Sequence, residues 1–129
     1  ARNLITYKGP KQAGPAKTRT EIEVPLEQGT QAAEGFRQLV QKLGYRPIAV
    51  VRKRRTIWHF PGGGFDLQAC FDEVAELGRF IELEIVAAAE KRREAEEVLQ
   101  KTAAALGLQH SERKSYLEML LEQRSVTSQ

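Results

Sequence analysis

Two short segments place carboxylates at alternate positions among aliphatic residues. The segment 81–85 reads I-E-L-E-I, and the segment 19–24 reads R-T-E-I-E-V. Because side chains on a strand point to opposite faces with a period of two, each segment would carry acids on one face and apolar side chains on the other. Carboxylate oxygens are hard ligands that suit Mg²⁺ or Mn²⁺. The alternation therefore predicts two strands with a charged face that can take part in metal or ion binding.

A run of four cations, 52–55, lies within another strand-like segment. Taken alone, such a run is most often a solvated basic surface or a nucleic-acid contact. Trp58 is a single aromatic residue and does not make a stacking platform for bases. Strands whose charged faces carry both signs instead favour a sheet that binds a polyanion with the help of a metal ion.

The composition is that of one mildly basic domain. The chain has 129 residues, a formal net charge of +3 and 41% hydrophobic residues, which is enough for one core. No apolar run approaches the roughly 18 residues needed to span a bilayer, and the first residues lack the layout of a signal peptide. The single cysteine, Cys70, cannot form an internal disulfide, which favours a reducing compartment, and we expect a cytoplasmic protein.

Other residues that could take part in chemistry have simpler interpretations. Cys70 lies in an apolar context and is expected to pack rather than to react. His59 and His110 have no metal-ligating neighbour at a useful spacing. The glycines 62–64 are expected to form a hairpin turn and not a phosphate-binding loop, because no helix follows them.

Hydrophobic periodicity and turn residues divide the chain into strands and helices. Strands are predicted at 3–8, 18–26, 46–60, 65–74 and 78–86. Helices are predicted from Thr30, as an N-cap, to Gly44, across about 88–106, and around Tyr116 with a capping box between Ser115 and Glu118. Short strands joined by turns, with helices inserted, predict an antiparallel α+β domain.

The apolar and charged faces of these strands indicate how the strands and helices should pack together. Burial of each large aliphatic side chain contributes roughly 1.5–3 kcal/mol, so the apolar faces need cover, and the amphipathic helices are available for it. With helices outside, the charged faces turn inward and line a barrel. Unpaired charge in such an interior is costly, so we expect it to hold water, metal and an anionic ligand.

Five segments, taken in order, resemble the CYTH superfamily of triphosphate tunnel enzymes, and within it the class IV adenylate cyclases. The segments are L-I-T-Y-K-G-P-K (4–11), K-T-R-T-E-I-E-V (17–24), V-R-K-R-R-T-I-W (51–58), F-D-E-V-A-E-L-G-R-F-I-E-L-E (71–84) and R-K-S-Y-L-E-M-L-L (113–121). This resemblance implies a single domain over 1–129, folded as a closed antiparallel β-barrel with helices packed outside. It also implies a triphosphate ligand, such as ATP, with Mg²⁺ or Mn²⁺ as cofactor.

The resemblance also implies roles for individual residues. The residues that match the family's phosphate-gripping cations are Lys8, Arg19, Lys53, Arg55 and Lys114, and the first four of these are the catalytic candidates. The residues that match its metal-holding acids are Glu21, Glu23, Asp72, Glu82 and Glu84. Arg52 and Arg54 would then face outward.

The family's opening strand, Glu-x-Glu-x-Lys, has no counterpart in this sequence. Its L-R-x-R strand is missing or reduced to Arg2. We expect a break in the chain near Arg2–Asn3, a segment before Ala1, or another chain that supplies these strands, because an open barrel would expose unpaired strand edges.

The expected function is therefore metal-dependent chemistry on a triphosphate. In a cyclase, the ribose 3′-hydroxyl attacks the α-phosphate to give cyclic AMP and pyrophosphate. The alternatives are an inorganic or thiamine triphosphatase, in which water attacks the terminal phosphate, and a non-catalytic binder of polyphosphate or nucleotide. We expect no membrane or nucleic-acid partner, and a homodimer is left open.

Overall fold

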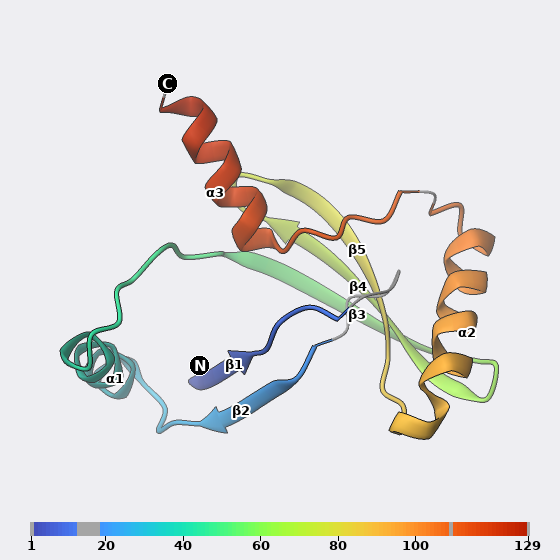
Figure 1. Ribbon diagram of the computed structural model, residues 1–129, viewed down its shortest axis with the longest axis horizontal. Coiled ribbons are helices and arrows are strands. Elements are labelled where there is room, and N and C mark those ends of the chain that lie inside the picture. The colour runs from blue at the N-terminus through green and yellow to red at the C-terminus, as the bar shows by residue number, and fades with distance from the viewer. Residues whose placement is uncertain (1, 13–18, 109, 129) are drawn as a thin grey trace. The chain divides into compact units, whose positions relative to one another are not determined.

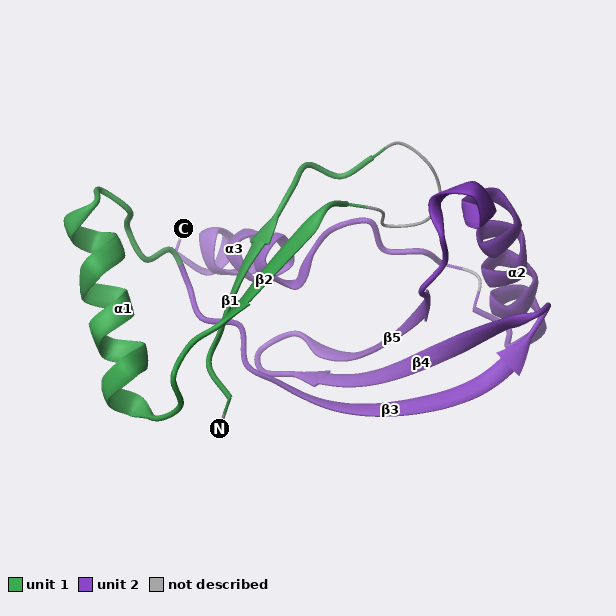
Figure 2. Cartoon of the chain, turned by 90° about the horizontal axis from the view of Figure 1, so that it is seen from below, with its two compact units in different colours: residues 1–48 green, residues 49–129 purple. Residues whose placement is uncertain are grey.

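The computed structural model describes residues 2–12, 19–108 and 110–128. The chain divides into two compact units, residues 1–48 and 49–129, which are coloured separately in Figure 2. Figure 1 shows the order of strands and helices along the chain. Antiparallel sheets and three α-helices give the mixed α+β class that the sequence predicts.

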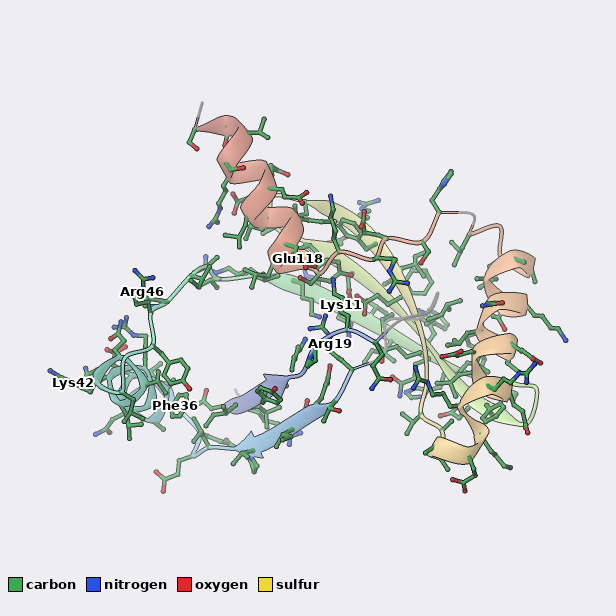
Figure 3. All side chains as sticks on the ribbon, viewed as in Figure 1. Lys11, Arg19, Phe36, Lys42, Arg46 and Glu118 are labelled. Atoms are coloured by element: carbon green, nitrogen blue, oxygen red, sulfur yellow. The ribbon has the colours of Figure 1, made fainter. Side chains whose placement is uncertain are left out.

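The first unit contains a two-stranded sheet and one helix. Strand β1 (Leu4–Lys8) pairs antiparallel with β2 (Glu21–Pro25), so that Lys8 lies opposite Glu21. Helix α1 (Thr30–Lys42) carries Phe36, one of the residues labelled in Figure 3, on its apolar stripe, and it buries none of its side chains. Residue 18, the first of the predicted strand 18–26, lies outside the described residues.

Helix α1 ends as predicted but begins differently. Its N-cap is Gly29, with no capping side chain, and Thr30 is the first helical residue. The expected Thr30 cap was therefore wrong by one position. At the other end the amide of Gly44 donates to the carbonyl of Gln41, and that of Tyr45 to Val40. Gly44 has a φ of 102°, so this is a Schellman ending.

The second unit is built on a three-stranded antiparallel sheet. Strand β3 (Lys53–Gly62) pairs with β4 (Phe65–Val74), which pairs with β5 (Gly78–Ile85). The predicted strand at 46–60 was wrong at its start, because β4 ends opposite Lys53. Among the described residues no strand pairs with 46–52.

Two helices complete the second unit. A 3₁₀ turn (Ala89–Lys91) leads into α2 (Arg92–Ala105), and α3 spans Tyr116–Thr127. The predicted capping box of α3 is confirmed: the amide of Glu118 donates to the Ser115 hydroxyl, and the amide of Ser115 donates to the Glu118 carboxylate. No helix in the described part of the chain is long and apolar enough to cross a membrane.

Burial along β4 changes face halfway along the strand. Leu67 and Ala69 are buried near the β3–β4 turn, whereas Cys70, Asp72 and Val74 are buried toward the other end. Alternate residues of a strand point to opposite faces, so the two halves of β4 are covered on different faces. The core therefore includes an ionisable side chain, Asp72, only 1% exposed.

The β3–β4 turn gives a direct test of this packing. Gly63 and Gly64 form a two-residue loop, and both have positive φ, which a type I′ turn requires. A Cβ added to Gly63 would lie 2.5 Å from Val98 Cγ2 of α2, whereas one added to Gly64 would meet nothing within 4 Å. The close approach at Gly63 is therefore specific to the packing of α2.

We expect Gly63→Ala to lower the free energy of unfolding by about 2–4 kcal/mol, through backbone strain and overpacking together. Gly64→Ala should cost about 1–2 kcal/mol from backbone strain alone. Urea denaturation of both variants measures the difference. Equal losses would show that α2 does not pack against this turn.

Candidate functional site

The register of the three-stranded sheet places five predicted site residues on one face. Residues directly opposite each other on paired strands share a face, and Arg55 lies opposite Asp72 while Glu82 lies opposite Cys70. Alternation along the strands adds two more residues. We call this surface the charged face; it carries Lys53, Arg55, Asp72, Glu82 and Glu84.

An ion pair between Arg55 and Asp72 forms the centre of the charged face. Arg55 Nε donates to Asp72 Oδ1 and Nη2 donates to Oδ2, each at 2.6 Å. This is the bidentate arrangement that matches a planar guanidinium to a carboxylate. The Asp72 side chain is fully buried, whereas that of Arg55 remains 24% exposed. Arg55 is thus held firmly by one edge while another part of it reaches solvent.

The acids of β5 face the other edge of the same guanidinium. Arg55 Nη2 also donates to Glu82 Oε2 at 3.0 Å, and Nη1 lies 4.0 Å from Glu84 Oε1. The charged face therefore combines two cations with three carboxylates, a formal excess of one negative charge. A polyanion would meet net repulsion on this surface unless a cation accompanied it.

These contacts shift the pKa values of the buried groups. The hydrogen bonds from Arg55, and then from Tyr116, hold the pKa of Asp72 below its usual range, against the opposing effect of burial. The same bond with Asp72 raises the pKa of Arg55. Burial raises the pKa of the Cys70 thiol, so that it stays protonated and packs, as the sequence predicts. The pair is therefore ionised and Cys70 is neutral at neutral pH.

Helix α3 contributes a residue that the sequence analysis did not identify. Tyr116 Oη donates to Asp72 Oδ2 at 2.6 Å, and its ring centroid lies 5.0 Å from that of Phe80. Lys53 Nζ lies 5.5 Å from the centroid of the Tyr116 ring. Helix α3 thus covers one end of the charged face, which differs from the expectation that the helices pack only outside.

The opposite face of the sheet carries the residues that were expected to point outward. Arg54 lies 3.9 Å from Glu73, and Glu73 lies 3.7 Å from Arg79. Arg54, Glu73 and Arg79 are all well exposed. Arg52 lines a shallow groove of about 600 Å³ at this end of the sheet together with Lys53, Arg54 and Arg79.

The remaining predicted site residues are Lys114 of the second unit and four residues of the first unit. Lys114 binds Glu122 of α3 at 2.8 Å, and this contact raises its pKa. In the first unit, Lys8 and Glu21 lie opposite each other, and Glu23 shares their face by alternation. Arg19, labelled in Figure 3, precedes β2 by two residues. Lys8, Arg19, Glu21 and Glu23 remain predicted site residues.

The acids differ in how well they fit a metal ion. No three His, Cys, Asp or Glu side chains gather as a metal site among residues 2–12, 19–108 and 110–128. Both oxygens of Asp72 are taken by Arg55 and Tyr116, so this carboxylate serves the arginine. Glu82 and Glu84 are more exposed and offer hard oxygens. Mg²⁺ commonly uses one or two carboxylates and completes its shell with water and substrate phosphates, so this pair fits such an ion.

Several known proteins are similar to this chain. The chain is 39% identical over 120 residues to a protein of Methanocaldococcus jannaschii named "Putative adenylate cyclase MJ0240", an alignment that covers 90% of this chain and 63% of that protein. The structure of the PH1819 protein from Pyrococcus horikoshii OT3 matches with a TM-score of 0.81 and 37% identity, over 95% of this chain and 66% of that one. The PH1012 protein of the same organism matches with a TM-score of 0.74 and 26% identity, over 91% and 66%.

The chain therefore spans about two thirds of the length of these relatives. The CYTH domain model matches residues 1–117, which is most of the sequence. By this match the chain belongs to the CYTH domain family.

Proposed function

We propose that the protein is a metal-dependent enzyme acting on a triphosphate, and that its reaction resembles that of a class IV adenylate cyclase. The observation that carries this proposal is the charged face, where Lys53 and Arg55 stand among Asp72, Glu82 and Glu84. The family match supports the triphosphate class. The M. jannaschii relative's name supports the cyclase reaction over the alternatives.

We further propose that the strands belong to a closed antiparallel barrel in the full-length protein, with the charged face as part of its lumen. Apolar side chains support this idea. Ile22 and Val24 on β2 are half exposed, as is Leu39 on α1. Such side chains gain free energy when covered, at roughly 25 cal/mol per Å² of apolar surface. In the closed barrel Lys8, Arg19, Glu21 and Glu23 would join the same lumen, and one domain would span 1–129.

The residues of the charged face have distinct tasks in this proposal. Lys53 and Arg55 bind phosphate oxygens of the triphosphate through charge-assisted hydrogen bonds, aided by Lys8, Arg19 and Lys114. Asp72 fixes the orientation of Arg55. In the cyclase reaction the ribose 3′-hydroxyl releases its proton to water as its oxygen bonds to the α-phosphorus, the bond from that phosphorus to the oxygen bridging to the β-phosphate breaks, and pyrophosphate leaves. The chain contributes positioning and electrostatic stabilisation.

Glu82 and Glu84 would hold Mg²⁺ or Mn²⁺, with Glu21 and Glu23 as further ligands in the closed barrel. A bound divalent ion would polarise a phosphoryl oxygen and stabilise the charge of the leaving pyrophosphate. It would also offset the excess negative charge of the charged face and so let a polyanion approach.

We expect Glu84→Gln to weaken Mn²⁺ binding at least about tenfold with little loss of stability. The substitution removes a charge from the acid cluster but keeps the side-chain size. Glu82→Gln should act in the same direction, although it also replaces a charged acceptor of Arg55 by a neutral one. Calorimetric titration with Mn²⁺ measures the effect, and Glu73→Gln on the opposite face is the matched control. Unchanged Mn²⁺ affinity in both variants would exclude a metal role for this pair.

A second candidate is a non-catalytic binder of polyphosphate or nucleotide. The surroundings of Arg55 favour this second candidate. A cation whose charge is already compensated by three carboxylates can bind phosphate without taking part in a reaction. Turnover assays of the full-length protein with ATP, thiamine triphosphate and tripolyphosphate, each with Mg²⁺ and with Mn²⁺, separate the candidates. Cyclic AMP from ATP is expected. Release of terminal phosphate alone would indicate a triphosphatase, and binding without turnover would indicate a binder.

A further inference from the structure

Tyr116 of α3 contacts Lys53 and the carboxylate of Asp72, which holds Arg55. Its hydroxyl donates to Asp72 Oδ2, the same oxygen that accepts from Arg55 Nη2. Its ring lies beneath Lys53 Nζ at 5.5 Å and against Phe80. The one side chain therefore reaches Lys53 directly and Arg55 through Asp72.

We propose that Tyr116 is a positioning residue that orients Arg55 and Lys53 for an incoming phosphate. This inference rests on the proposed function only in naming phosphate as the ligand. The positioning itself is a property of the protein without ligand.

The reason lies in the rotation of the Asp72 carboxylate. Two bonds from Arg55 couple the carboxylate and the guanidinium, yet the coupled pair can still swing together. A third bond, from a residue on a different element, fixes the carboxylate plane and therefore the guanidinium plane. The Nε–Nη2 edge of Arg55 then faces Asp72, and Nη1 is left toward Glu84 on β5. A phosphate that binds beside β5 would meet Nη1, whose direction is set by the bonds on the opposite edge of the guanidinium.

Helix α3 has other anchors that do not involve Asp72. Leu120 is 2% exposed, and at the far end of α3 Gln123 Nε2 donates to the Glu76 carbonyl while Arg124 binds the Glu76 carboxylate at 2.8 Å. Tyr116→Phe keeps the ring that contacts Phe80 and Lys53 and removes only the hydroxyl. We therefore expect α3 to stay docked in this variant, with circular dichroism and thermal unfolding as checks.

The first experiment needs no ligand. Exchange of the Arg55 Nε proton with water, followed by ¹⁵N NMR, reports how firmly the guanidinium is held. Loss of one hydrogen bond of about 1 kcal/mol predicts exchange about fivefold faster in Tyr116→Phe. Gln123→Ala is the control, since it removes an anchor of α3 without touching Asp72, and it should leave the exchange unchanged. Equal rates in wild type and Tyr116→Phe, or the same acceleration in Gln123→Ala, would overturn the positioning role.

The second experiment asks whether the effect passes through Asp72. Calorimetric titration with tripolyphosphate and Mg²⁺ should show about three- to tenfold weaker binding in Tyr116→Phe, and no further loss when the same change is made in an Asp72→Asn background. An equal loss in both backgrounds would overturn the proposed route through Asp72. If the wild-type protein binds no tripolyphosphate, the proposed function fails, and the exchange rates still decide the role of Tyr116.

Discussion

Asp72→Ala is expected to lower the free energy of unfolding by about 3–5 kcal/mol, the range for removing one partner of a buried ion pair. The carboxylate is fully buried, accepts two bonds from Arg55 and accepts a third from Tyr116. Its removal takes two hydrogen bonds from the guanidinium, which keeps only its weaker contacts with Glu82 and Glu84, and it takes the acceptor from the Tyr116 hydroxyl. Urea denaturation, with the unfolding midpoint and slope both fitted, measures the loss.

The adjacent residue on β4 provides a matched control for this experiment. Glu73 points to the opposite face, is well exposed, and lies 3.9 Å from Arg54 and 3.7 Å from Arg79. Exposed ion pairs contribute roughly 0–1 kcal/mol, so Glu73→Ala should cost less than 1 kcal/mol. Similar losses for Asp72→Ala and Glu73→Ala would contradict the burial of Asp72 and its role as the anchor of Arg55.

Arg55→Lys is expected to weaken binding of tripolyphosphate about 10- to 100-fold while the protein stays folded. Lysine keeps the positive charge that Asp72 requires but replaces a planar, five-donor group by a point charge. It cannot hold Asp72 with one edge and present another edge to phosphate. Charge-assisted hydrogen bonds contribute about 1.5–3 kcal/mol each, which gives the expected range. Isothermal titration with Mg²⁺ present measures the affinity.

Arg54→Lys is the control for this prediction, because Arg54 is the neighbouring residue on the other face of β3 and is 85% exposed at its side chain. Its affinity for tripolyphosphate should stay within about twofold of wild type. A larger loss in Arg54→Lys than in Arg55→Lys would move the phosphate site from the charged face to the opposite one.

The hairpin of the second unit is the feature that the sequence predicts best. The glycines after Pro61 predict the hairpin but not its loop length. The structure has a two-residue loop at Gly63–Gly64, which places Arg55 opposite Asp72, and a one-residue longer loop would have moved Arg55 out of this pairing. Strand periodicity then places Lys53 with Arg55 and Glu82 with Glu84. These relations are local, because they depend on turn length and on a period of two.

The role of Tyr116 could not be predicted in the same way. Its bond to Asp72 spans 44 positions in the sequence, and nothing in the residues near Tyr116 specifies which face of the sheet α3 covers. The capping box at Ser115 fixes where the helix begins but not where it packs.

The start of β3 is a similar case. The apolar and basic residues at 46–52 suit a strand, but β-structure also needs a partner, and β4 ends opposite Lys53.

The most direct test of the account is to follow the arginine and lysine side chains by NMR while tripolyphosphate and Mg²⁺ are added to the full-length protein. The Arg55 guanidinium and Lys53 ammonium resonances are expected to shift together and to saturate. Arg54 and Arg79, on the opposite face of the same sheet, should shift little. Saturating shifts at Arg54 and Arg79 with none at Arg55 and Lys53 would contradict the claim that the charged face binds the triphosphate.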